Sequence, residues 1–282
     1  MQPSNLPTFK LGLIGYPLGH SLSPKIHTAA LKACGLQGDY SLFPIAPDDK
    51  KGLKDLLAHV RSGEIHGLNV TIPHKQNVIE LIDELTPTAQ AIGAVNTIYL
   101  KSNKLIGDNT DATGFLSDLK RFVERETSRQ RNKSVLVLGA GGSAKAVVYA
   151  LVNDGWNVAI AARRLEQAEE LASQFEGVTT IELDLQTFKL SNVQLTVNTT
   201  PLGMTPNIDS SPLPKGSILS QGTIIYDLVY NPRETKFVRE AKQQGLQATT
   251  GLGMLIEQAA LAFEIWTKHT PPRDVLWSAV EN

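Results

Sequence analysis

Cysteine is almost absent from this chain of 282 residues, in which Cys34 is the only one. A single cysteine excludes a disulfide within the chain and a metal site built from several cysteines, and it is typical of a reducing compartment. No group of cysteine and histidine residues has the spacing of metal ligands, so we expect no metal. The cysteine content therefore favours a cytoplasmic protein.

Long apolar runs and an excess of either charge are also missing. A membrane helix needs ~20 consecutive apolar residues, and every apolar run here is much shorter. The first ten residues lack the charged start and apolar core of a signal peptide. The formal net charge is −1, which leaves no basic excess for a phosphate backbone. We expect neither a membrane nor a nucleic acid as a partner.

The residues that are present are those of an ordinary globular protein, with 41% hydrophobic and 20% charged residues. The length favours two domains over one. Apolar strand patterns alternate with amphipathic helix patterns, which is typical of α/β domains with largely parallel sheets. The sequence predicts a first α/β domain over residues 1–110, completed by C-terminal helices at 253–282, and a second domain over residues 111–252.

Within the first domain, Ser23 and Pro24 are expected to begin a helix, with Ser23 as its N-cap. A further helix is expected at 76–85, and one at 111–123. The charged stretch at 124–133 is either the exposed end of that helix or a linker. The expected strands of the two domains lie at 9–15, 40–45, 67–72, 96–100, 134–138, 157–162, 194–198 and 223–227.

A glycine-rich turn opens the second domain. The apolar run Ser134–Leu138 leads directly into Gly139, Ala140, Gly141, Gly142 and Ser143, and a helix pattern follows. Gly139 permits a tight turn, Gly141 lets backbone N–H groups approach a pyrophosphate, and Ala144 replaces the third glycine of the dinucleotide-binding pattern. The alternative is a tight turn that binds nothing, but the strand before and the helix after it favour a Rossmann-type dinucleotide site.

The end of the second strand of this domain selects the cofactor. An NAD site places a carboxylate there to bind the ribose 2′-hydroxyl. This chain has Arg163 and Arg164 instead, and guanidinium groups suit the 2′-phosphate of NADP. Arg164, and less readily Arg163, could instead be a solvated residue at a helix start.

Eight polar motifs occur in order along the chain. They are S-L-S from Ser21, N-V-T-I-P-H-K to Lys75, G-A-V-N-T with Asn96, D-N-T-D with Asp111, the glycine-rich turn, N-T-T-P-L-G-M from Asn198, Y-D-L-V-Y-N-P with Tyr230, and G-L-G-M-L-I-E-Q to Gln258. In this order they resemble the shikimate dehydrogenase family over nearly the whole chain. The resemblance implies NADP-dependent, reversible reduction of 3-dehydroshikimate to shikimate in the shikimate pathway, which leads to chorismate and the aromatic amino acids.

The resemblance also implies roles for individual residues. Lys75 and Asp111 would be catalytic, with Lys75 giving the proton and Asp111 orienting it. The substrate would be bound by Ser21, Ser23, Thr71, Lys75, Asn96, Asp111, Tyr230 and Gln258. NADP(H) would contact the glycine-rich turn (Gly139, Ala140, Gly141, Gly142, Ser143) together with Arg163, Arg164, Thr199, Leu228 and Gly251. A proton donor works best with a pKa near the ambient pH, so partial desolvation of Lys75 is expected.

Simpler interpretations compete with several of these roles. Ser23 could serve only as an N-cap, Asp111 or Thr110 could cap the helix that follows, and Gln258 could reach solvent at the rim of an apolar helix face. Ala162 and Gln167 also depart from residues common in the family.

Three alternatives therefore stay open for the whole protein: a shikimate dehydrogenase, a quinate/shikimate dehydrogenase with relaxed cofactor use, and a non-enzymatic NADP-binding regulator. The sequence does not set the oligomeric state, and a homodimer remains one option.

Overall fold

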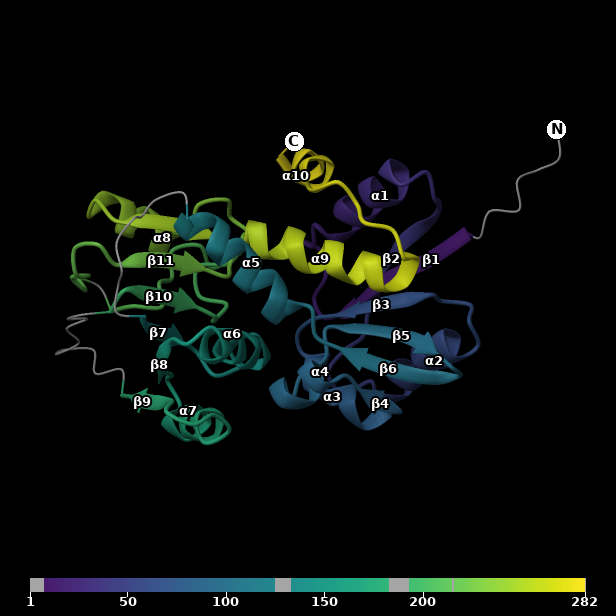
Figure 1. Cartoon of the computed structure of the whole chain (residues 1–282), viewed down its shortest axis with the longest axis horizontal. Coiled ribbons are helices and arrows are strands. Elements are labelled where there is room, and N and C mark those ends of the chain that lie inside the picture. The colour runs from purple at the N-terminus through teal and green to yellow at the C-terminus, as the bar shows by residue number, and fades with distance from the viewer. Residues whose placement is uncertain (1–7, 125–132, 183–192, 215, 282) are drawn as a thin grey trace. The chain divides into compact units, whose positions relative to one another are not determined.

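The computed structural model describes residues 8–124, 133–182, 193–214 and 216–281. It divides into two compact units (Figure 1). Unit 1 contains residues 1–114 and 256–282, and unit 2 contains residues 115–255. Each unit therefore has its own sheet and core. The charged stretch predicted as a helix end or linker falls largely on residues 125–132, which lie outside the described residues.

Unit 1 is built on a mixed sheet of six strands in the order β2-β1-β3-β5-β6-β4. Strands β1, β2 and β3 are parallel, whereas β5 runs antiparallel to both β3 and β6. All four residues of β3 are buried, as expected of a strand covered on both faces. The strands are β1 Thr8–Gly15, β2 Gln37–Pro44, β3 Gly67–Val70, β4 Glu84–Leu85, β5 Thr97–Lys101 and β6 Lys104–Asp108.

The helices of unit 1 come from both ends of the chain. Its N-terminal part supplies α1 Ser23–Ala33, α2 Lys50–Arg61, α3 His74–Asn77, the 3-10 helix η1 Ile79–Leu81 and α4 Pro87–Ile92. Its C-terminal part supplies most of α9 Leu252–Thr267 and all of α10 Arg273–Glu281, and α10 packs against α1. A core of buried aliphatic residues, among them Leu53, Val60, Leu68 and Ile98, lies between α2 and the sheet.

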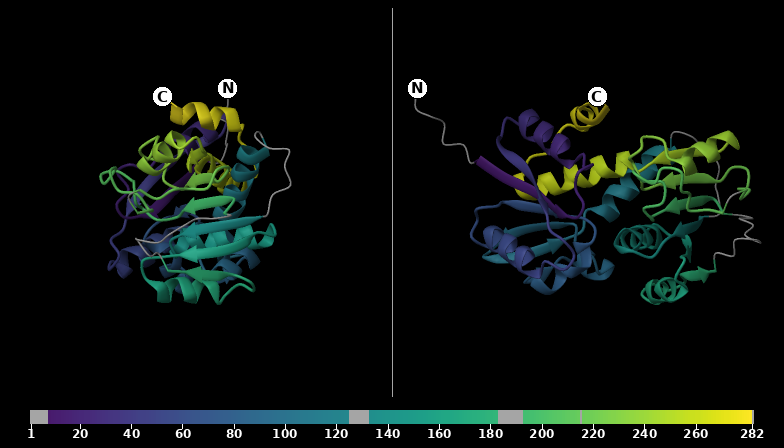
Figure 2. Two further views of the ribbon diagram at one scale, coloured as in Figure 1. Left: turned by 90° about the vertical axis from the view of Figure 1, so that its left-hand side faces the viewer. Right: turned by 180° about the vertical axis from the view of Figure 1, so that it is seen from behind.

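Unit 2 has a six-stranded parallel sheet in the order β12-β11-β10-β7-β8-β9. This is the doubly wound order of the Rossmann fold, with its switch point between β7 and β10. Figure 2 shows the sheet from two further directions. Its elements are β7 Ser134–Leu138, α6 Gly142–Asn153, β8 Asn157–Ala161, α7 Leu165–Ala172, β9 Thr179–Ile181, β10 Leu195–Asn198, β11 Ile224–Asp227, α8 Lys236–Gln243 and β12 Gln247–Thr250.

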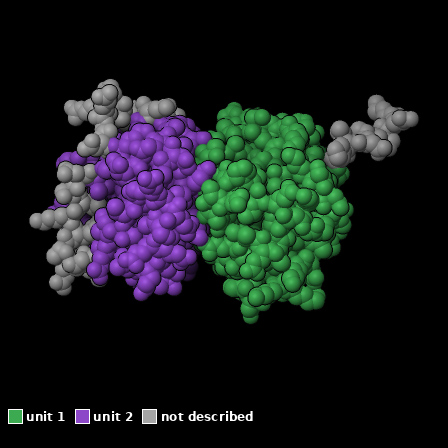
Figure 3. Space-filling model, turned by 60° about the horizontal axis from the view of Figure 1, so that its bottom comes forward, with its two compact units in different colours: residues 1–114, 256–282 green, residues 115–255 purple. Residues whose placement is uncertain are grey.

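Two helices contain the positions at which the chain changes from one unit to the other; Figure 3 colours the two units. Helix α5, Asp111–Glu124, begins in unit 1 and continues into unit 2 after Gly114. Helix α9 returns to unit 1 at Ile256. The chain therefore changes units inside helices and not in loops.

The helix predicted at 76–85 is wrong. This segment forms the short α3, then η1, and then the strand β4, which pairs with β6. Asp83 accepts hydrogen bonds from Leu105 N at 2.7 Å and from both terminal nitrogens of Arg61. Contacts with distant parts of the chain thus hold the segment at the sheet edge and override its local helical pattern.

The predicted N-cap at Ser23 is also wrong. Helix α1 already includes Ser23, Leu22 occupies the N-cap position, and no side chain caps the helix there. Instead, Ser21 Oγ accepts a hydrogen bond from Ser23 N at 3.2 Å. The serine that lies outside the helix therefore satisfies the first helical amide.

Candidate functional site

Lys75 and Asp111 form a buried ion pair in unit 1. Lys75 lies on α3, directly after the turn that follows β3, and Asp111 is the first residue of α5. Lys75 Nζ lies 2.6 Å from Asp111 Oδ2, and the two side chains are only 12% and 7% exposed. The predicted partial desolvation of Lys75 is therefore present. At such depth the two charges interact more strongly than at a protein surface.

Asn109 explains why the Asp111 carboxylate can face the lysine. Asn109 Oδ1 accepts hydrogen bonds from Asp111 N at 3.0 Å and from Ala112 N at 3.3 Å. It therefore acts as the cap of α5. Thr110 precedes the helix, and its carbonyl oxygen accepts from Gly114 N at 2.9 Å. The capping side chain, however, is that of Asn109 and not that of Thr110 or Asp111. The capping preference of asparagine was a signal for this role in the sequence.

Asn96 joins the Lys75–Asp111 pair to the end of the sheet. Its Nδ2 donates to Asp111 Oδ1 at 2.8 Å and to Thr110 Oγ1 at 3.0 Å. Its Oδ1 accepts from Thr110 N at 2.8 Å. Asn96 is 2% exposed, so this amide fixes the direction of the carboxylate within a buried network.

Gln258 reaches the same network from α9. Its Oε1 lies 3.3 Å from Asn96 Nδ2, and the residue is buried. The alternative in which Gln258 reaches solvent at the helix rim is therefore wrong. A Cβ at Gly114 would lie 2.7 Å from Gln258 N, so the glycine lets α5 and α9 cross closely enough for this contact.

Asn69 and Thr97 extend this network, and the sequence analysis did not assign them to the site. Asn69 Nδ2 donates to Asn96 O at 3.3 Å, and its Oδ1 accepts from Tyr40 Oη at 2.8 Å. Thr97 Oγ1 donates to Asn96 Oδ1 at 2.9 Å. Their side chains lie on neighbouring strands, a pairing that only the antiparallel contact of β3 with β5 reveals.

Ser21, Ser23 and Thr71 follow the carboxyl ends of β1 and β3. These two parallel strands are adjacent, and the loops after them are joined by a hydrogen bond from Tyr16 N to Ile72 O at 2.9 Å. Ser21 and Thr71 are half-buried, and Ser23 is buried. The structure therefore brings these hydroxyls to the edge of the sheet from which α3 and Lys75 begin.

His74 contacts the backbone near the end of a neighbouring strand. His74 is buried, and its Nε2 lies 2.7 Å from Ile45 O. This bond ties α3 to the end of β2. It agrees with the sequence analysis, which assigned no chemical role to His74.

In unit 2, the glycine-rich turn lies at the carboxyl end of β7. Gly139 has a φ of 110°, and a Cβ there would lie 2.7 Å from Thr199 Oγ1. A Cβ at Gly141 would meet nothing within 4 Å, and no side chain caps α6 at its N-terminus. A helix N-terminus without a capping side chain, next to the open position at Gly141, fits a pyrophosphate at this helix end.

Arg163 and Arg164 follow β8, next to the strand that leads into this turn. Both are exposed. Within the described ranges, neither arginine forms an ion pair. Their guanidinium groups are therefore suited to an anion such as a 2′-phosphate.

Thr199, Leu228 and Gly251 surround the same end of the sheet. Thr199 Oγ1 donates to Leu138 O at 2.7 Å, which holds the loop after β10 against β7. A Cβ at Gly251 would clash with the carbonyl oxygen of Leu228, so only glycine fits there. Tyr230 follows Leu228 by two residues, and burial raises the pKa of its hydroxyl.

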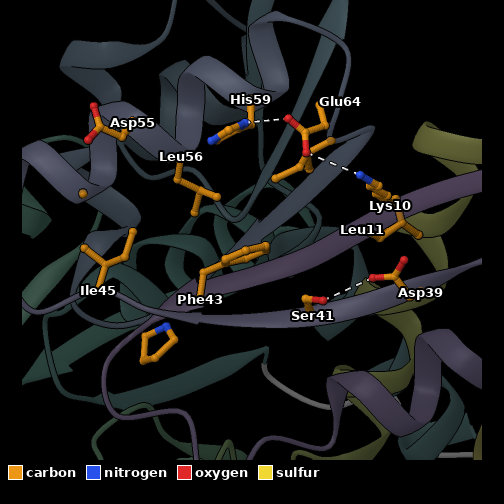
Figure 4. Close-up of a pocket in the computed structure, with 13 residues that line it drawn as sticks. Lys10, Leu11, Asp39, Ser41, Phe43, Ile45, Asp55, Leu56, His59 and Glu64 are labelled. Carbon is orange, nitrogen blue, oxygen red and sulfur yellow. Dashed lines mark hydrogen bonds and ion pairs between the residues drawn. The ribbon is translucent and has the colours of Figure 1, made fainter.

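A separate hollow of about 560 Å³ lies on unit 1 between α2 and strands β1 and β2 (Figure 4). In it, Glu64 bonds His59 Nδ1 at 2.8 Å and Lys10 Nζ at 3.4 Å. None of the predicted site residues lines this hollow. The candidate site is therefore defined by its side chains and not by this feature of the surface.

Other classes of site find no support in the described part of the chain. No helix there combines the length and apolar character that a membrane span requires. No three histidine, cysteine or acidic side chains converge as metal ligands among those same residues.

Three family models match the chain in succession. They are the shikimate dehydrogenase substrate binding domain at residues 13–98, shikimate / quinate 5-dehydrogenase at residues 121–230, and the shikimate 5′-dehydrogenase C-terminal domain at residues 251–281. The first and nearly all of the third fall in unit 1, and the second falls in unit 2.

Individual relatives match over almost their full length. Shikimate dehydrogenase (NADP+) of Carboxydothermus hydrogenoformans is 42% identical, with 95% of each chain covered. The enzyme of the same name from Methanocaldococcus jannaschii is 40% identical, covering 98% of this chain and 97% of the relative.

Among solved structures, shikimate 5-dehydrogenase of Thermus thermophilus in complex with NADP(H) and shikimate is 36% identical. Its TM-score is 0.85, with 97% of this chain and 98% of that chain covered. The family models, the identities and the shared fold agree over most of the chain. The chain belongs to the shikimate dehydrogenase family.

Proposed function

We propose that this protein is an NADP-dependent shikimate dehydrogenase, which reversibly reduces 3-dehydroshikimate to shikimate in the biosynthesis of chorismate and the aromatic amino acids. The observation that carries the proposal is the buried pair of Lys75 and Asp111 at 2.6 Å. Membership of the family and the names of its relatives supply the reaction. The pair supplies the proton that reduction of a ketone requires.

The hydrogen bonds around Asp111 favour Lys75 as the proton donor. Asp111 Oδ2 accepts from Lys75 Nζ, and Asp111 Oδ1 accepts from Asn96 Nδ2. An ionised carboxylate only accepts hydrogen bonds, so the transferable proton of the pair resides on the ammonium group. Lys75 would give this proton to the oxygen formed at the reduced carbon, while Asp111 holds the ammonium group in place.

The remaining polar groups of unit 1 suit a small substrate with a carboxylate and several hydroxyls. Ser21, Ser23 and Thr71 offer hydroxyl groups, and Asn96 and Gln258 offer amides. Tyr230 of unit 2 offers a phenolic hydroxyl. We assign the substrate carboxylate to the serines and the ring hydroxyls to Thr71, Asn96 and Gln258, and we propose Tyr230 as the substrate-binding residue of unit 2.

The residues of unit 2 would hold NADP(H). The backbone from Gly139 to Ser143 would bind the pyrophosphate, Arg163 and Arg164 the 2′-phosphate, and the loops at Thr199, Leu228 and Gly251 the rest of the molecule. When bound, NADPH supplies the hydride for the reduction. The exposed arginines and the absence of a carboxylate at the end of β8 favour NADP over NAD.

A four-way assay tests this function. Initial rates of oxidation would be measured with shikimate or quinate, each with NADP+ or NAD+. We expect the highest kcat/KM for shikimate with NADP+. A rate with quinate equal to that with shikimate would instead establish a quinate/shikimate dehydrogenase, and binding of NADP+ without turnover of either substrate would establish a regulator.

A further inference from the structure

Two loops that we assign to the cofactor share one buried anchor in unit 2. Asn198 and Asp227 are the last residues of β10 and β11, and they are paired in the parallel register. Both are fully buried, and Asn198 Nδ2 donates to Asp227 Oδ1 at 2.8 Å. The two side chains thus join the strand ends at the edge where a Rossmann sheet binds its ligand.

Asn198 holds the loop that follows β10. Its Oδ1 accepts hydrogen bonds from Thr200 N at 3.0 Å and from Thr200 Oγ1 at 2.7 Å. Its Nδ2 also lies 3.3 Å from Leu202 O. These contacts fix the backbone of residues 199–202, so the orientation of the Asn198 amide decides the shape of this loop.

Asp227 holds the loop that follows β11. Its Oδ1 also accepts from Val229 N at 3.0 Å, and its Oδ2 accepts from Thr235 Oγ1 at 2.6 Å. Thr235 Oγ1 in turn accepts from Val238 N at 3.3 Å and so caps α8. One carboxylate therefore connects residues 228–229, the start of α8 and, through Asn198, the loop after β10.

The buried environment of the Asp227 side chain disfavours the charged form of its carboxyl group. Burial raises the pKa of Asp227 to about 6, while its three hydrogen bonds oppose this shift. No cation pairs with it within the described residues. A buried charge without a counter-ion destabilises a fold unless donors surround it. Packing alone therefore does not account for an aspartate at this position.

We infer that Asp227 is a positioning residue of the cofactor site, whose carboxylate sets the conformation of the loops at 199–202 and 228–229 together. This inference rests on the proposed function, because it takes both loops to contact NADP(H). An amide at residue 227 would keep the size of the side chain but would turn one acceptor into a donor. The Thr235 hydroxyl would then lose its acceptor, and the link between the loops would loosen.

Kinetics of Asp227→Asn test the inference. We expect its KM for NADP+ to rise about tenfold, the equivalent of one hydrogen bond. The KM for shikimate at saturating NADP+ should rise much less, because Tyr230 alone among the residues that follow these two strands is assigned to the substrate. Thr235→Val removes the hydroxyl and should also raise the KM for NADP+. Thr235→Ser keeps the hydroxyl and should raise the KM for NADP+ much less.

Asp154→Asn is the matched control. Asp154 is another carboxylate of unit 2, paired with Lys120 and Lys133 at the C-terminal end of α6. It lies after the last residue of that helix, whereas the glycine-rich turn lies at its start. We expect its KM for NADP+ to equal that of the wild type.

Direct titration of NADP+ and circular dichroism complete the experiment. A variant that is merely less stable would lose active protein and hence rate, but would keep the wild-type KM and dissociation constant for NADP+. That result for Asp227→Asn would overturn the inference. A wild-type protein that binds NADP+ but does not oxidise shikimate would overturn the proposed function instead, and the binding data would still test Asp227.

Discussion

At the scale of single residues, Asn96 contributes to the candidate site by holding other polar side chains in place. Its amide bonds Asp111, Thr110 and Gln258, and it lies at 2% exposure. The Asp111 carboxylate is thereby held by Lys75 from one side and by the amide from the other. Such pre-arranged polar groups lower the reorganisation that accompanies proton transfer.

Replacing Lys75 is the most direct test of the chemistry. We expect Lys75→Ala to lower kcat by about a thousandfold, because a positioned proton donor contributes on the order of 10²–10⁴ to the rate. The dissociation constant for NADP+ should stay near that of the wild type, because Lys75 lies in unit 1 and the proposed cofactor residues lie in unit 2. Stopped-flow or steady-state rates with titration of NADP+ would measure both.

Lys104→Ala serves as the control for Lys75→Ala. Lys104 is a half-exposed lysine of unit 1 that pairs with Glu84 at the sheet edge. Its loss should leave kcat unchanged, since exposed ion pairs contribute little. If Lys75→Ala kept wild-type kcat, the assignment of the proton donor would be wrong.

At the scale of elements, the crossing of α5 and α9 places two residues of the site. Helix α5 carries Asp111, and α9 carries Gln258. Gly114 lies between them, and its missing side chain is what permits the close approach. Helix propensity alone would favour alanine at this position by about 1 kcal/mol, so the glycine reflects packing between the helices.

Gly114→Ala should therefore destabilise the protein. The added Cβ would lie 2.7 Å from Gln258 N and 2.8 Å from Gln258 Cβ. Because the clash involves backbone, we expect a net loss of about 2 kcal/mol and a higher KM for shikimate as Gln258 shifts. Thermal unfolding and steady-state kinetics would measure the two effects.

Ser117→Ala on the same helix is the matched control. Ser117 is exposed on α5, so alanine there adds no contact and should leave the Tm unchanged or slightly raised. If Gly114→Ala raised the Tm as much as Ser117→Ala does, the higher helix propensity of alanine would outweigh the clash between α5 and α9. That result would contradict the packing argument.

Two segments of the chain show when a local sequence pattern is enough to predict secondary structure and when it is not. The strand-turn-helix around Gly139 was predictable, because consecutive residues form it. The segment at 76–85 was not, because its end pairs with β6, which lies about twenty residues later in the chain. The pairing of β4 with β6 is a non-local contact, and such contacts have no signature in a window of ten residues.

At the scale of the whole molecule, the buried His27 makes the free energy of unfolding depend on pH. His27 of α1 is fully buried, with its ring stacked on Tyr40 at 4.3 Å and close to Trp266 of α9. Burial lowers the pKa of His27 to about 3, against a smaller opposing effect of the Asn69 side chain. The folded protein therefore keeps His27 neutral at a pH where the unfolded chain binds a proton.

His27→Phe should make the protein less sensitive to acid. The unfolded histidine titrates near pH 6.5, so the wild type loses stability as the pH falls below this value toward 3. Relative to the wild type, the free energy of unfolding of His27→Phe should improve by about 2 kcal/mol between pH 7 and pH 5. Urea denaturation at both pH values would measure this difference.

His20→Phe controls for the loss of a histidine as such. His20 is exposed, so its replacement should leave the pH dependence of stability unchanged. If His27→Phe and the wild type lost stability in parallel between pH 7 and pH 5, then the neutral state of buried His27 would not be a source of acid sensitivity.

The sequence by itself determined the two α/β parts, the dinucleotide turn and the residue types of the site, because these follow from periodicity and from motifs of adjacent residues. The sequence analysis also placed the end of the chain with the first part. Only the tertiary structure decided that Asn109 caps α5, that Asn96 holds Asp111, and that Asp227 links two loops. Each of these contacts depends on the directions of buried side chains from separate strands and helices, and those directions are set by packing and not by spacing along the chain.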